Sequence, residues 1–338
     1  MNILITGGNG YIGSHTCVAL HERFPEAQLI IVDNLANSTP QSLEKLNNIV
    51  KEGIRFYEID ICDEQALEVL FHEYQFDGVI HFAGYKAVGE SVVKPLKYYG
   101  NNLNGTLNLV KNCLKYKVNR FVFSSSATVY GNGECPFVET QEQLHTSSPY
   151  GETKAMCERI LIDVAKINPE FGVSILRYFN PIGAHTSGLI GEAPSGVPNN
   201  LMPYITKVAN GDLELLNVFG DDYETVDGTG VRDYIHVMDL AEGHVAALEK
   251  LTPGTHIYNL GTGQGTTVLQ LVQTFERVNG VPVPYRIVAR RPGDIAEIFA
   301  NVNKAEKELK WKAKRTLEEM CRDAWNFENK NLLNKSYR

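Results

Sequence analysis

The stretch Thr6-Gly7-Gly8-Asn9-Gly10-Tyr11-Ile12-Gly13 lies between an apolar run and an amphipathic segment, and it decides the fold. The apolar run, Asn2 to Thr6, is typical of a buried strand, and the segment that extends to about Arg23 is typical of a helix. The glycines match two related patterns, G-x-G-x-x-G at Gly8, Gly10 and Gly13, and G-x-x-G-x-x-G at Gly7, Gly10 and Gly13. Glycines here permit a tight turn and let backbone N–H groups approach a pyrophosphate at the positive end of a helix. The stretch therefore predicts a dinucleotide site.

An acidic residue follows at the distance that is typical of such a site. Asp33 ends a second apolar run, Gln28 to Val32, 20 residues after Gly13. A carboxylate there accepts hydrogen bonds from the adenosine ribose and repels a 2′-phosphate, so we expect NAD rather than NADP. Asp60-Ile61 and Phe82-Ala83-Gly84 follow a third and a fourth run, at the edge where such sheets bind ligands.

Short apolar runs alternate with longer amphipathic segments through the first half of the chain, as in βαβ units. The expected strands are 2–6, 28–32, 54–59, 78–81, 120–124 and 173–177. Continuous apolar runs are typical of parallel strands covered on both faces, so we predict an α/β fold with a Rossmann-type, doubly wound parallel sheet. Loop-rich sequence follows Phe179, and helical patterns return at 201–210, 238–250, 268–279 and 317–327. We therefore expect a NAD-binding domain at 1–179 and a smaller mixed α/β substrate domain at 180–338, with a boundary that can be interleaved.

Composition excludes several classes of protein. The 338 residues are 43% hydrophobic and 21% charged, as in ordinary globular proteins. Forty acidic residues against 32 basic ones give a formal charge of −8, so no nucleic-acid partner is expected. The N-terminus has no positive region before its apolar stretch, and no run approaches the roughly 20 apolar residues of a membrane span, so we expect a cytoplasmic protein and no membrane partner. Six cysteines are spread singly without a C-x-x-C pair, and no metal site is expected.

A tyrosine and a lysine share one face of a predicted helix. Tyr150 and Lys154 are i and i+4 in the segment 148–154, so their Cβ atoms lie roughly 6 Å apart. A free tyrosine titrates at about 10, but the Lys154 ammonium and an oxidised nicotinamide ring favour the phenolate. Such a phenolate can take the proton from a substrate alcohol as hydride leaves its carbon, and Ser126 can share the hydrogen bond to that oxygen.

Longer motifs resemble a known enzyme family. Four of them are similar to the extended short-chain dehydrogenases: T-G-G-x-G-Y-I-G at 6–13, H-F-A-G-Y-K-A-V-G-E-S at 81–91, S-S-S-A-T-V-Y-G at 124–131 and S-P-Y-G-x-T-K at 148–154. Within that group, three further motifs resemble the UDP-glucose 4-epimerase family: R-Y-F-N-P-I-G-A-H at 177–185, P-N-N-L-M-P-Y at 198–204 and G-T-G-V-R-D-Y-I-H-V-M-D-L at 228–240. The resemblance covers nearly the whole chain and weakens toward the C-terminus.

The resemblance implies interconversion of UDP-galactose and UDP-glucose with a tightly held NAD that is reduced and reoxidised within each turnover. Tyr150 would remove the C4 hydroxyl proton while hydride passes from C4 to NAD⁺, which gives a 4-keto sugar. The keto sugar would then turn over and take the hydride back on its other face, so that C4 is inverted. Because the family is commonly homodimeric through paired helices, we expect a homodimer, with 95–117 and the helix after Tyr150 at its interface.

The resemblance also assigns residues to each ligand. The implied catalytic residues are Tyr150, Lys154 and Ser126. The implied NAD contacts are Gly7, Gly10, Tyr11, Ile12, Gly13, Asp33, Asn34, Asp60, Ile61, Phe82, Ala83, Gly84, Lys86, Asn101, Tyr150, Lys154 and Phe179. The implied nucleotide-sugar contacts are Ser126, Tyr150, Asn180, Asn200, Leu201, Phe219, Arg232, Arg291, Asp294 and Ile298. The two arginines suit a diphosphate through charge and forked donors, although Arg232 beside Asp233 also fits a local ion pair, and the asparagines also fit turns.

Ile298 departs from the family pattern. Its position is tyrosine in some members and cysteine in others, and a smaller residue there goes with tolerance of an N-acetyl group on the sugar. Isoleucine is intermediate in bulk, so we expect weak turnover of UDP-N-acetylhexosamines.

Three other functions fit parts of the sequence. A nucleotide-sugar 4,6-dehydratase begins with the same oxidation at C4, but its elimination step needs a further acid and base. Relatives that eliminate resemble a pattern with Asp-Glu, whereas this chain has Ala127 and Thr128. A UDP-glucuronate decarboxylase would devote added basic residues to the C6 carboxylate, and the sequence identifies no such set. A non-catalytic sensor of NAD or a nucleotide sugar would lose the Tyr150 and Lys154 pair, which is present.

Overall fold

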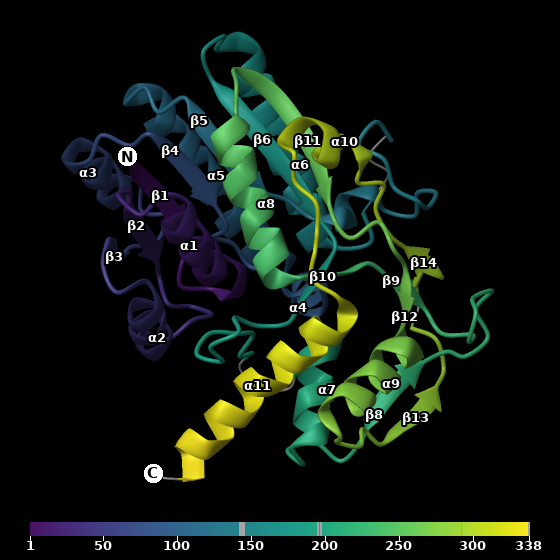
Figure 1. Ribbon diagram of the computed structural model, residues 1–338. Helices are drawn as coiled ribbons and strands as arrows, with labels where there is room; N and C mark the ends of the chain where they lie inside the picture. The colour runs from purple at the N-terminus through teal and green to yellow at the C-terminus, as the bar shows by residue number, and fades with distance from the viewer. Residues whose placement is uncertain (142–145, 195, 197, 292, 337–338) are drawn as a thin grey trace.

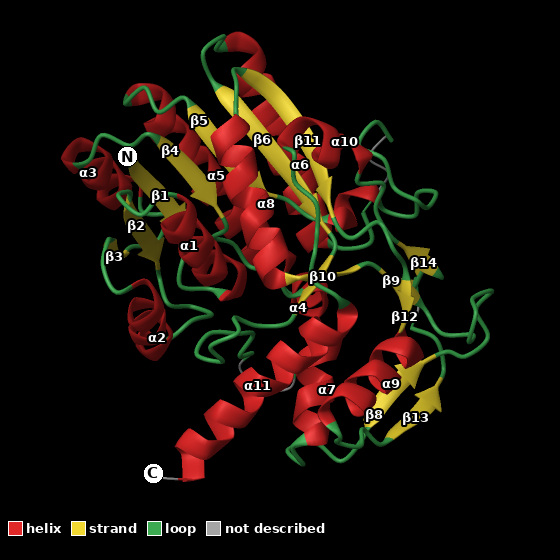
Figure 2. Cartoon of the chain, viewed as in Figure 1, coloured by secondary structure: helices red, strands yellow, loops and turns green. Residues whose placement is uncertain are grey.

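The computed structural model describes residues 1–141, 146–194, 196, 198–291 and 293–336. Its centre is a seven-stranded sheet with the order β11-β6-β5-β4-β1-β2-β3, and every ladder in it is parallel (Figures 1 and 2). The strands are β1 (Asn2–Thr6), β2 (Gln28–Asp33), β3 (Ile54–Glu58), β4 (Gly78–His81), β5 (Arg120–Ser124), β6 (Gly172–Tyr178) and β11 (Gly254–Leu260). The order reverses between β1 and β4, which is where doubly wound sheets bind ligands. The predicted fold class is confirmed.

Alternate residues of the central strands enter two different cores. In β1, Ile3 and Ile5 face the helices α1 (Tyr11–Arg23), α2 (Pro40–Val50), α8 (Val237–Lys250) and α10 (Asn303–Leu309). Leu4 faces the other core, with α3 (Glu64–Glu73), α5 (Pro95–Lys115) and α6 (Pro149–Ile167). All three side chains are fully buried, and such burial stabilises the fold by about 1.5–3 kcal/mol per side chain. Helices on both faces thus explain why the strands read as unbroken apolar runs.

A smaller unit lies beside the sheet, at the lower right of Figure 1. Its core contains Ile205, Leu271, Phe275 and Cys321. Its helices are α7 (Leu201–Ala209), α9 (Val268–Asn279) and α11 (Leu317–Ser336). Its strands form three small sheets: β7 (Asn180–Ile182) with β10 (Tyr234–His236), β8 (Leu216–Phe219) with β13 (Tyr285–Val288), and β9 (Val231–Arg232) between β12 (Thr266–Thr267) and β14 (Glu297–Ile298).

The chain returns to the large sheet after leaving it. β11 pairs along its whole length with β6, and α8 packs against α1 on one face of the sheet. We did not expect a strand at 254–260, because the side chains His256 and Asn259 interrupt its apolar pattern. β11 is one of the two edge strands of the sheet and its first half is only partly buried, so it needs no unbroken apolar run. The division into 1–179 and 180–338 stays a prediction. The segment from α8 to β11 comes from the second of these ranges but packs on the large sheet of the first.

Among the described helices, none combines the length and apolar character needed to span a bilayer. The cytoplasmic location expected from the sequence stays a prediction.

Candidate active site

The turn between β1 and α1 is packed too closely for side chains. Gly7 has φ +69°, and its N–H donates to the Val32 carbonyl at 2.7 Å. A Cβ atom on Gly13 would lie 2.3 Å from the Gly7 carbonyl oxygen, so only glycine fits there. The helix begins after Gly10, and within the described residues no side chain caps it. Its first N–H groups therefore stay available to an anionic group at the positive end of the helix.

Asp33 lies at the end of β2 with its carboxylate already oriented. One oxygen accepts from the Asn9 N–H at 3.2 Å, and the other accepts from the Leu35 N–H at 2.9 Å and the Ser38 hydroxyl at 3.1 Å. Burial raises the pKa of Asp33, and these hydrogen bonds oppose that rise. A carboxylate held in this way can accept from a ribose hydroxyl, as the sequence predicted.

The remaining predicted cofactor residues gather at the same edge of the sheet. The Phe82 and Ala83 N–H groups donate to the Thr6 carbonyl at 3.0 and 3.1 Å, which holds the loop after β4 against β1. The Asn34 amide donates to Asp60 at 3.0 Å, which ties the loop after β2 to the loop after β3. This arrangement fits a dinucleotide, because no side chain caps the start of α1 and the Asp33 carboxylate lies at the end of the adjacent strand β2.

The start of α6 positions the tyrosine and the lysine. Ser148 caps the helix by accepting from the Gly151 N–H at 3.2 Å, and Pro149 occupies its first turn. One turn further on, the Lys154 ammonium donates to the Ser124 carbonyl at 2.8 Å and lies 4.8 Å from the centroid of the Phe123 ring. Both contacts come from the end of β5, so α6 is fixed against the strand that carries the serines.

Ser126 begins the short 3₁₀ helix η1 (Ala127–Tyr130), directly after β5. Its hydroxyl accepts from the Thr128 N–H at 3.2 Å and from the Thr128 hydroxyl at 3.0 Å. The Ser126 and Tyr178 side chains both form hydrogen bonds with the Tyr150 hydroxyl. The structure therefore brings the three predicted catalytic residues to one place.

Burial sets the proton affinities of this group. It raises the pKa of Tyr150, while the hydrogen bonds with Ser126 and Tyr178 lower it. It lowers the pKa of Lys154 to about 8, against the charge of Glu158 and the neighbouring Cys157. Because an oxidised nicotinamide adds a positive charge, cofactor binding would favour the phenolate of Tyr150 over the neutral phenol.

The predicted nucleotide-sugar residues come from several short elements of the smaller unit. Arg232 on β9 lies 3.6 Å from Asp294 and donates to the Ile295 carbonyl at 3.0 Å. Ile298 on β14 pairs in register with Arg232. At the end of β8, the Phe219 ring lies 3.8 Å from the guanidinium carbon of Arg291.

Two predicted residues are joined by a side chain that we did not predict. The Asn200 amide, just before α7, donates to Glu192 at 2.6 Å, and the Lys86 ammonium lies 3.4 Å from the same oxygen. Glu192 thus links a predicted cofactor residue to a predicted substrate residue. It stands alone in a loop, so no motif or spacing in the sequence indicated it.

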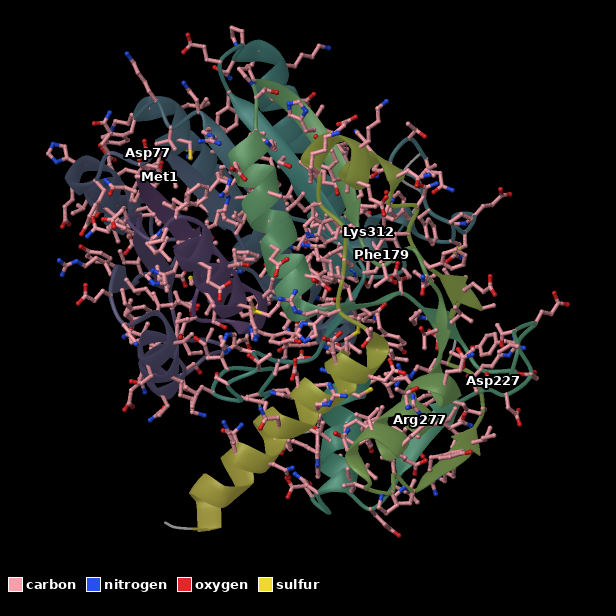
Figure 3. All side chains as sticks on the ribbon, in the orientation of Figure 1. Met1, Asp77, Phe179, Asp227, Arg277 and Lys312 are labelled. Carbon is pink, nitrogen blue, oxygen red and sulfur yellow. The ribbon has the colours of Figure 1, made fainter. Side chains whose placement is uncertain are left out.

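Tyr178 is the second functional residue that we missed. It ends β6, and Phe179 and Asn180 follow it where the chain leaves the large sheet (Figure 3). The Phe179 N–H donates to the Leu260 carbonyl at 3.2 Å, and the Asn180 N–H donates to the Asp233 carbonyl at 3.0 Å. The motif at 177–185 contained the signal, because Tyr178 precedes two residues that we selected.

Comparison with known proteins gives consistent matches over the whole chain. A family model described as GDP-mannose 4,6 dehydratase matches residues 4–324. The UDP-glucose 4-epimerase of Bacillus subtilis (strain 168) is 55% identical over 98% of both chains, and that of Pasteurella multocida (strain Pm70) is 54% identical over all of both chains.

Solved structures agree with these relatives. UDP-glucose-4-epimerase from Stenotrophomonas maltophila, solved with bound NAD and formylated UDP-arabinopyranose, has a TM-score of 0.96 and 48% identity over 99% of each chain. The Bifidobacterium longum enzyme, in complex with NAD⁺ and UDP, has a TM-score of 0.94 and 49% identity over 98% of this chain and 99% of its own. The glycine turn, the buried tyrosine and these full-length matches lead to one assignment: the chain belongs to the UDP-glucose 4-epimerase family.

Proposed function

We propose that the chain is a UDP-glucose 4-epimerase that interconverts UDP-galactose and UDP-glucose with an NAD retained through each turnover. One observation carries the proposal. The buried Tyr150 hydroxyl, hydrogen bonded with Ser126, lies beside the strand ends that form the dinucleotide cradle. The full-length relatives named UDP-glucose 4-epimerase support the same activity.

The proposed cofactor residues surround the edge of β1 to β4. The glycine turn takes the pyrophosphate, Asp33 takes the adenosine ribose, and the loops after β3 and β4 line the remainder. When bound, NAD⁺ supplies the acceptor for the hydride from C4 of the sugar, and its reduced form supplies the donor that returns it. The solved relatives that contain NAD or NAD⁺ support this choice of cofactor.

Tyr150 moves the proton in both directions. As a phenolate it takes the proton of the C4 hydroxyl when the C4–H bond breaks, and it returns the same proton to the carbonyl oxygen when that bond reforms on the other face. Ser126 donates a hydrogen bond to the same sugar oxygen, and the Lys154 ammonium stabilises the phenolate through its charge. No proton or electron is consumed overall, so the reaction is an isomerisation.

The nucleotide is held apart from the reacting sugar. Arg232 and Arg291 carry the charge and forked donors that suit a diphosphate. Asn180, Asn200, Leu201, Phe219 and Asp294 are the further proposed contacts. These residues belong to the smaller unit, whereas Tyr150 on α6 and Ser126 after β5 belong to the unit built on the large sheet, so the UDP can be gripped while the hexose turns over.

A 4,6-dehydratase is the alternative that the name of the family model raises. Its elimination needs an acid and a base beside the sugar, but the positions after Ser126 hold Ala127 and Thr128. The Thr128 hydroxyl donates to Ser126 at 3.0 Å, which is a positioning contact for Ser126. Without carboxylates at these positions, the 4-keto sugar is reduced again.

Proton NMR tests the activity directly. The purified protein is mixed with UDP-galactose without added cofactor, and the anomeric signals are followed. We expect UDP-glucose to appear up to a fixed equilibrium ratio. A 6-deoxy methyl signal would show dehydration instead, and a mixture that stays unreactive after NAD is added would overturn the proposal.

We also propose that a second copy of this chain covers the outer face of α4 (Val88–Val93) and α5. Val93 and Leu96 are 74% and 84% exposed at the junction of these helices. Leu107 and Leu114 are also exposed and continue the same stripe along α5, because residues 11 and 18 positions further on return to one helix face. Sedimentation should give a dimer for the wild type and a monomer for Leu96→Glu, and an unchanged dimer in that variant would contradict this interface.

A further inference from the structure

A buried ion pair lies beneath the catalytic residues, and none of the proposed ligand contacts includes it. Arg177 on β6 and Glu158 on α6 are 4% and 0% exposed, and their side chains are 2.7 Å apart. Burying two charges carries a large desolvation cost, and apolar replacements of such pairs are often as stable or more stable. Stability alone therefore explains this pair poorly, and its other contacts indicate a second role.

Glu158 reaches the strand that carries the catalytic serine. The Ser125 hydroxyl donates to the Glu158 carboxylate, and the Ser125 N–H donates to the Leu176 carbonyl at 2.9 Å. Ser125 is fully buried and lies between Ser124, whose carbonyl accepts from Lys154, and Ser126. A change at the Ser125 side chain is therefore passed to both neighbours through the backbone.

Arg177 contacts the far end of the segment that runs from Ser125 through η1. Its guanidinium carbon lies 4.8 Å from the centroid of the Tyr130 ring, which belongs to η1. The Tyr130 hydroxyl in turn donates to the Asn259 side chain on β11 at 2.6 Å. Ser126, at the start of η1, is thus fixed between two contacts that both lead to the ion pair.

Glu158 also faces Lys154, one helical turn away. Besides Tyr150, whose phenolate belongs to the proposed mechanism, the groups that face the Lys154 ammonium are Cys157 and Glu158 on α6, His81 on β4, His244 on α8, and the Phe123 ring and Ser124 carbonyl on β5. Burial lowers the pKa values of His81 and His244 to about 3 and about 4, so both rings are neutral at pH 7. Burial also raises the pKa of the Cys157 thiol. Among these groups, Glu158 therefore supplies the negative charge.

We propose that Glu158 is a positioning residue for the epimerisation, which holds Ser126 in place through its contact with Ser125. Its carboxylate also lies one helical turn from Lys154, where a negative charge favours the ammonium. The inference rests on the proposed roles of Ser126, Tyr150 and Lys154. The ion pair with Arg177 gives this buried carboxylate a partner of opposite charge.

Ser125→Ala tests whether Glu158 positions Ser126 through Ser125. The substitution removes the hydrogen bond between Ser125 and Glu158 and leaves the ion pair with Arg177 intact. Ser174→Ala is the matched control, since Ser174 is a fully buried serine on the adjacent strand β6 whose hydroxyl has no partner among the described residues. We expect kcat to fall about tenfold in Ser125→Ala, with the KM for UDP-galactose, the NAD content and the unfolding midpoint equal to those of Ser174→Ala.

Glu158→Gln and Glu158→Asp test the charge. Glu158→Gln removes a negative charge that favours the ammonium, so the pKa of Lys154 should fall. The alkaline limb of the pH profile of kcat should then move to lower pH by about one unit. Glu158→Asp keeps the charge but shortens the reach, so kcat should fall while the limb stays in place. Glu158→Asp remains informative if the glutamine variant, which leaves Arg177 unpaired, does not fold.

Three results would overturn the inference. The first is a Ser125→Ala enzyme with the kcat of Ser174→Ala. The second is a loss of kcat in Ser125→Ala that comes together with lost NAD and a lower unfolding midpoint than in Ser174→Ala, as a purely structural role predicts. The third is an alkaline limb that stays in place in Glu158→Gln or moves in Glu158→Asp. A wild-type protein without epimerase activity would overturn the proposed function itself, which the NMR experiment detects separately.

Discussion

The proposed cofactor side and the proposed nucleotide-sugar side of the active site are built in different ways. On the cofactor side, backbone groups of consecutive strand ends define the shape, and a single Cβ at Gly13 would collide with the Gly7 carbonyl. On the nucleotide-sugar side, side chains from separate loops pair with one another, such as Arg232 with Asp294. The first kind of site is rigid before a ligand binds. We expect the second kind to exchange its internal pairs for contacts with the ligand.

This difference suits the proposed reaction. A cofactor that is never released gains from a site whose backbone is already in place, because little conformational freedom is lost on binding. A substrate that binds and leaves in each turnover needs contacts that form and break, and paired side chains can do so at small cost. The predictions below separate the two sides, in order of decreasing effect.

Tyr150→Phe should have the largest effect. Removing the hydroxyl deletes the group that carries the proton, so we expect kcat to fall by about a thousandfold or more. Bound NAD should remain, because the glycine turn and Asp33 are untouched. Absorbance of released cofactor and the NMR assay measure the two quantities, and unchanged turnover would refute the assignment of Tyr150.

Gly13→Ala should remove the cofactor. The new methyl group would lie 2.3 Å from the Gly7 carbonyl oxygen, and the turn must shift to relieve the collision. We expect the purified variant to contain little NAD and to show little activity. Gly89→Ala is the control, since its Cβ meets nothing within 4 Å, and it should keep its NAD. Equal NAD contents would show that the turn is less rigid than its packing indicates.

Arg232→Ala should affect the nucleotide-sugar side of the site and leave the cofactor side unchanged. Losing charge-assisted hydrogen bonds to a diphosphate costs about 1.5–3 kcal/mol, so we expect the KM for UDP-galactose to rise roughly 10- to 100-fold. The NAD content should not change. Arg277→Ala, which removes an exposed arginine that pairs with Glu318, is the control and should leave KM unaltered. Lost NAD in Arg232→Ala would mean that the two sides are not independent.

The pH dependence should reflect Lys154. Its pKa is lowered by burial to about 8, so the ammonium is present below that pH and is lost above it. We expect kcat to fall by about tenfold for each pH unit above the midpoint of this limb. Because the substrate side contributes none of this titration, Arg232→Ala should show the same midpoint, which steady-state assays across the pH range would check.

Ile298 should have the smallest effect. It is half-buried on β14 and packs against the cluster that contains Phe179. We expect weak turnover of UDP-N-acetylglucosamine by the wild type and a several-fold gain in Ile298→Ala, with activity on UDP-galactose little changed. Complete absence of product from the wild type at high enzyme concentration would refute the predicted weak turnover, and an Ile298→Ala enzyme without the gain would remove Ile298 as a determinant of sugar choice.

The sequence predicted the cofactor side better than the substrate side for a physical reason. A strand, a glycine turn and a helix are neighbours in the chain, so the pattern at 2–23 specifies its own geometry. The contact between Asn200 and Glu192 joins two loops, and the stacking of Arg291 on Phe219 joins residues far apart in sequence. Residue spacing carries no information about such contacts, and only the family resemblance indicated these substrate residues.

The fold shows the same limit at one edge of the sheet. The inner strands were recognised because burial on both faces demands apolar residues at most positions, and the edge strand β3 was recognised by its partly buried Ile54, Phe56 and Tyr57. β11 was missed because an edge strand relaxes that demand, and the pair Glu158 and Arg177 was missed because charged residues give no sign in the sequence that they are buried.

The same edge strand determines how far the molecule can be divided. A fragment that ends at Phe179 would lack β11, and the seven residues of β6 would lose the hydrogen-bonding partner that covers them. It would also lack α8, which covers the apolar side of α1. An unpaired inner strand is a template for strand addition between molecules, so the isolated fragment would self-associate. We therefore expect that the cofactor-binding half is not a transferable module, because α8 and β11, which complete it, lie in the chain between proposed substrate-binding residues.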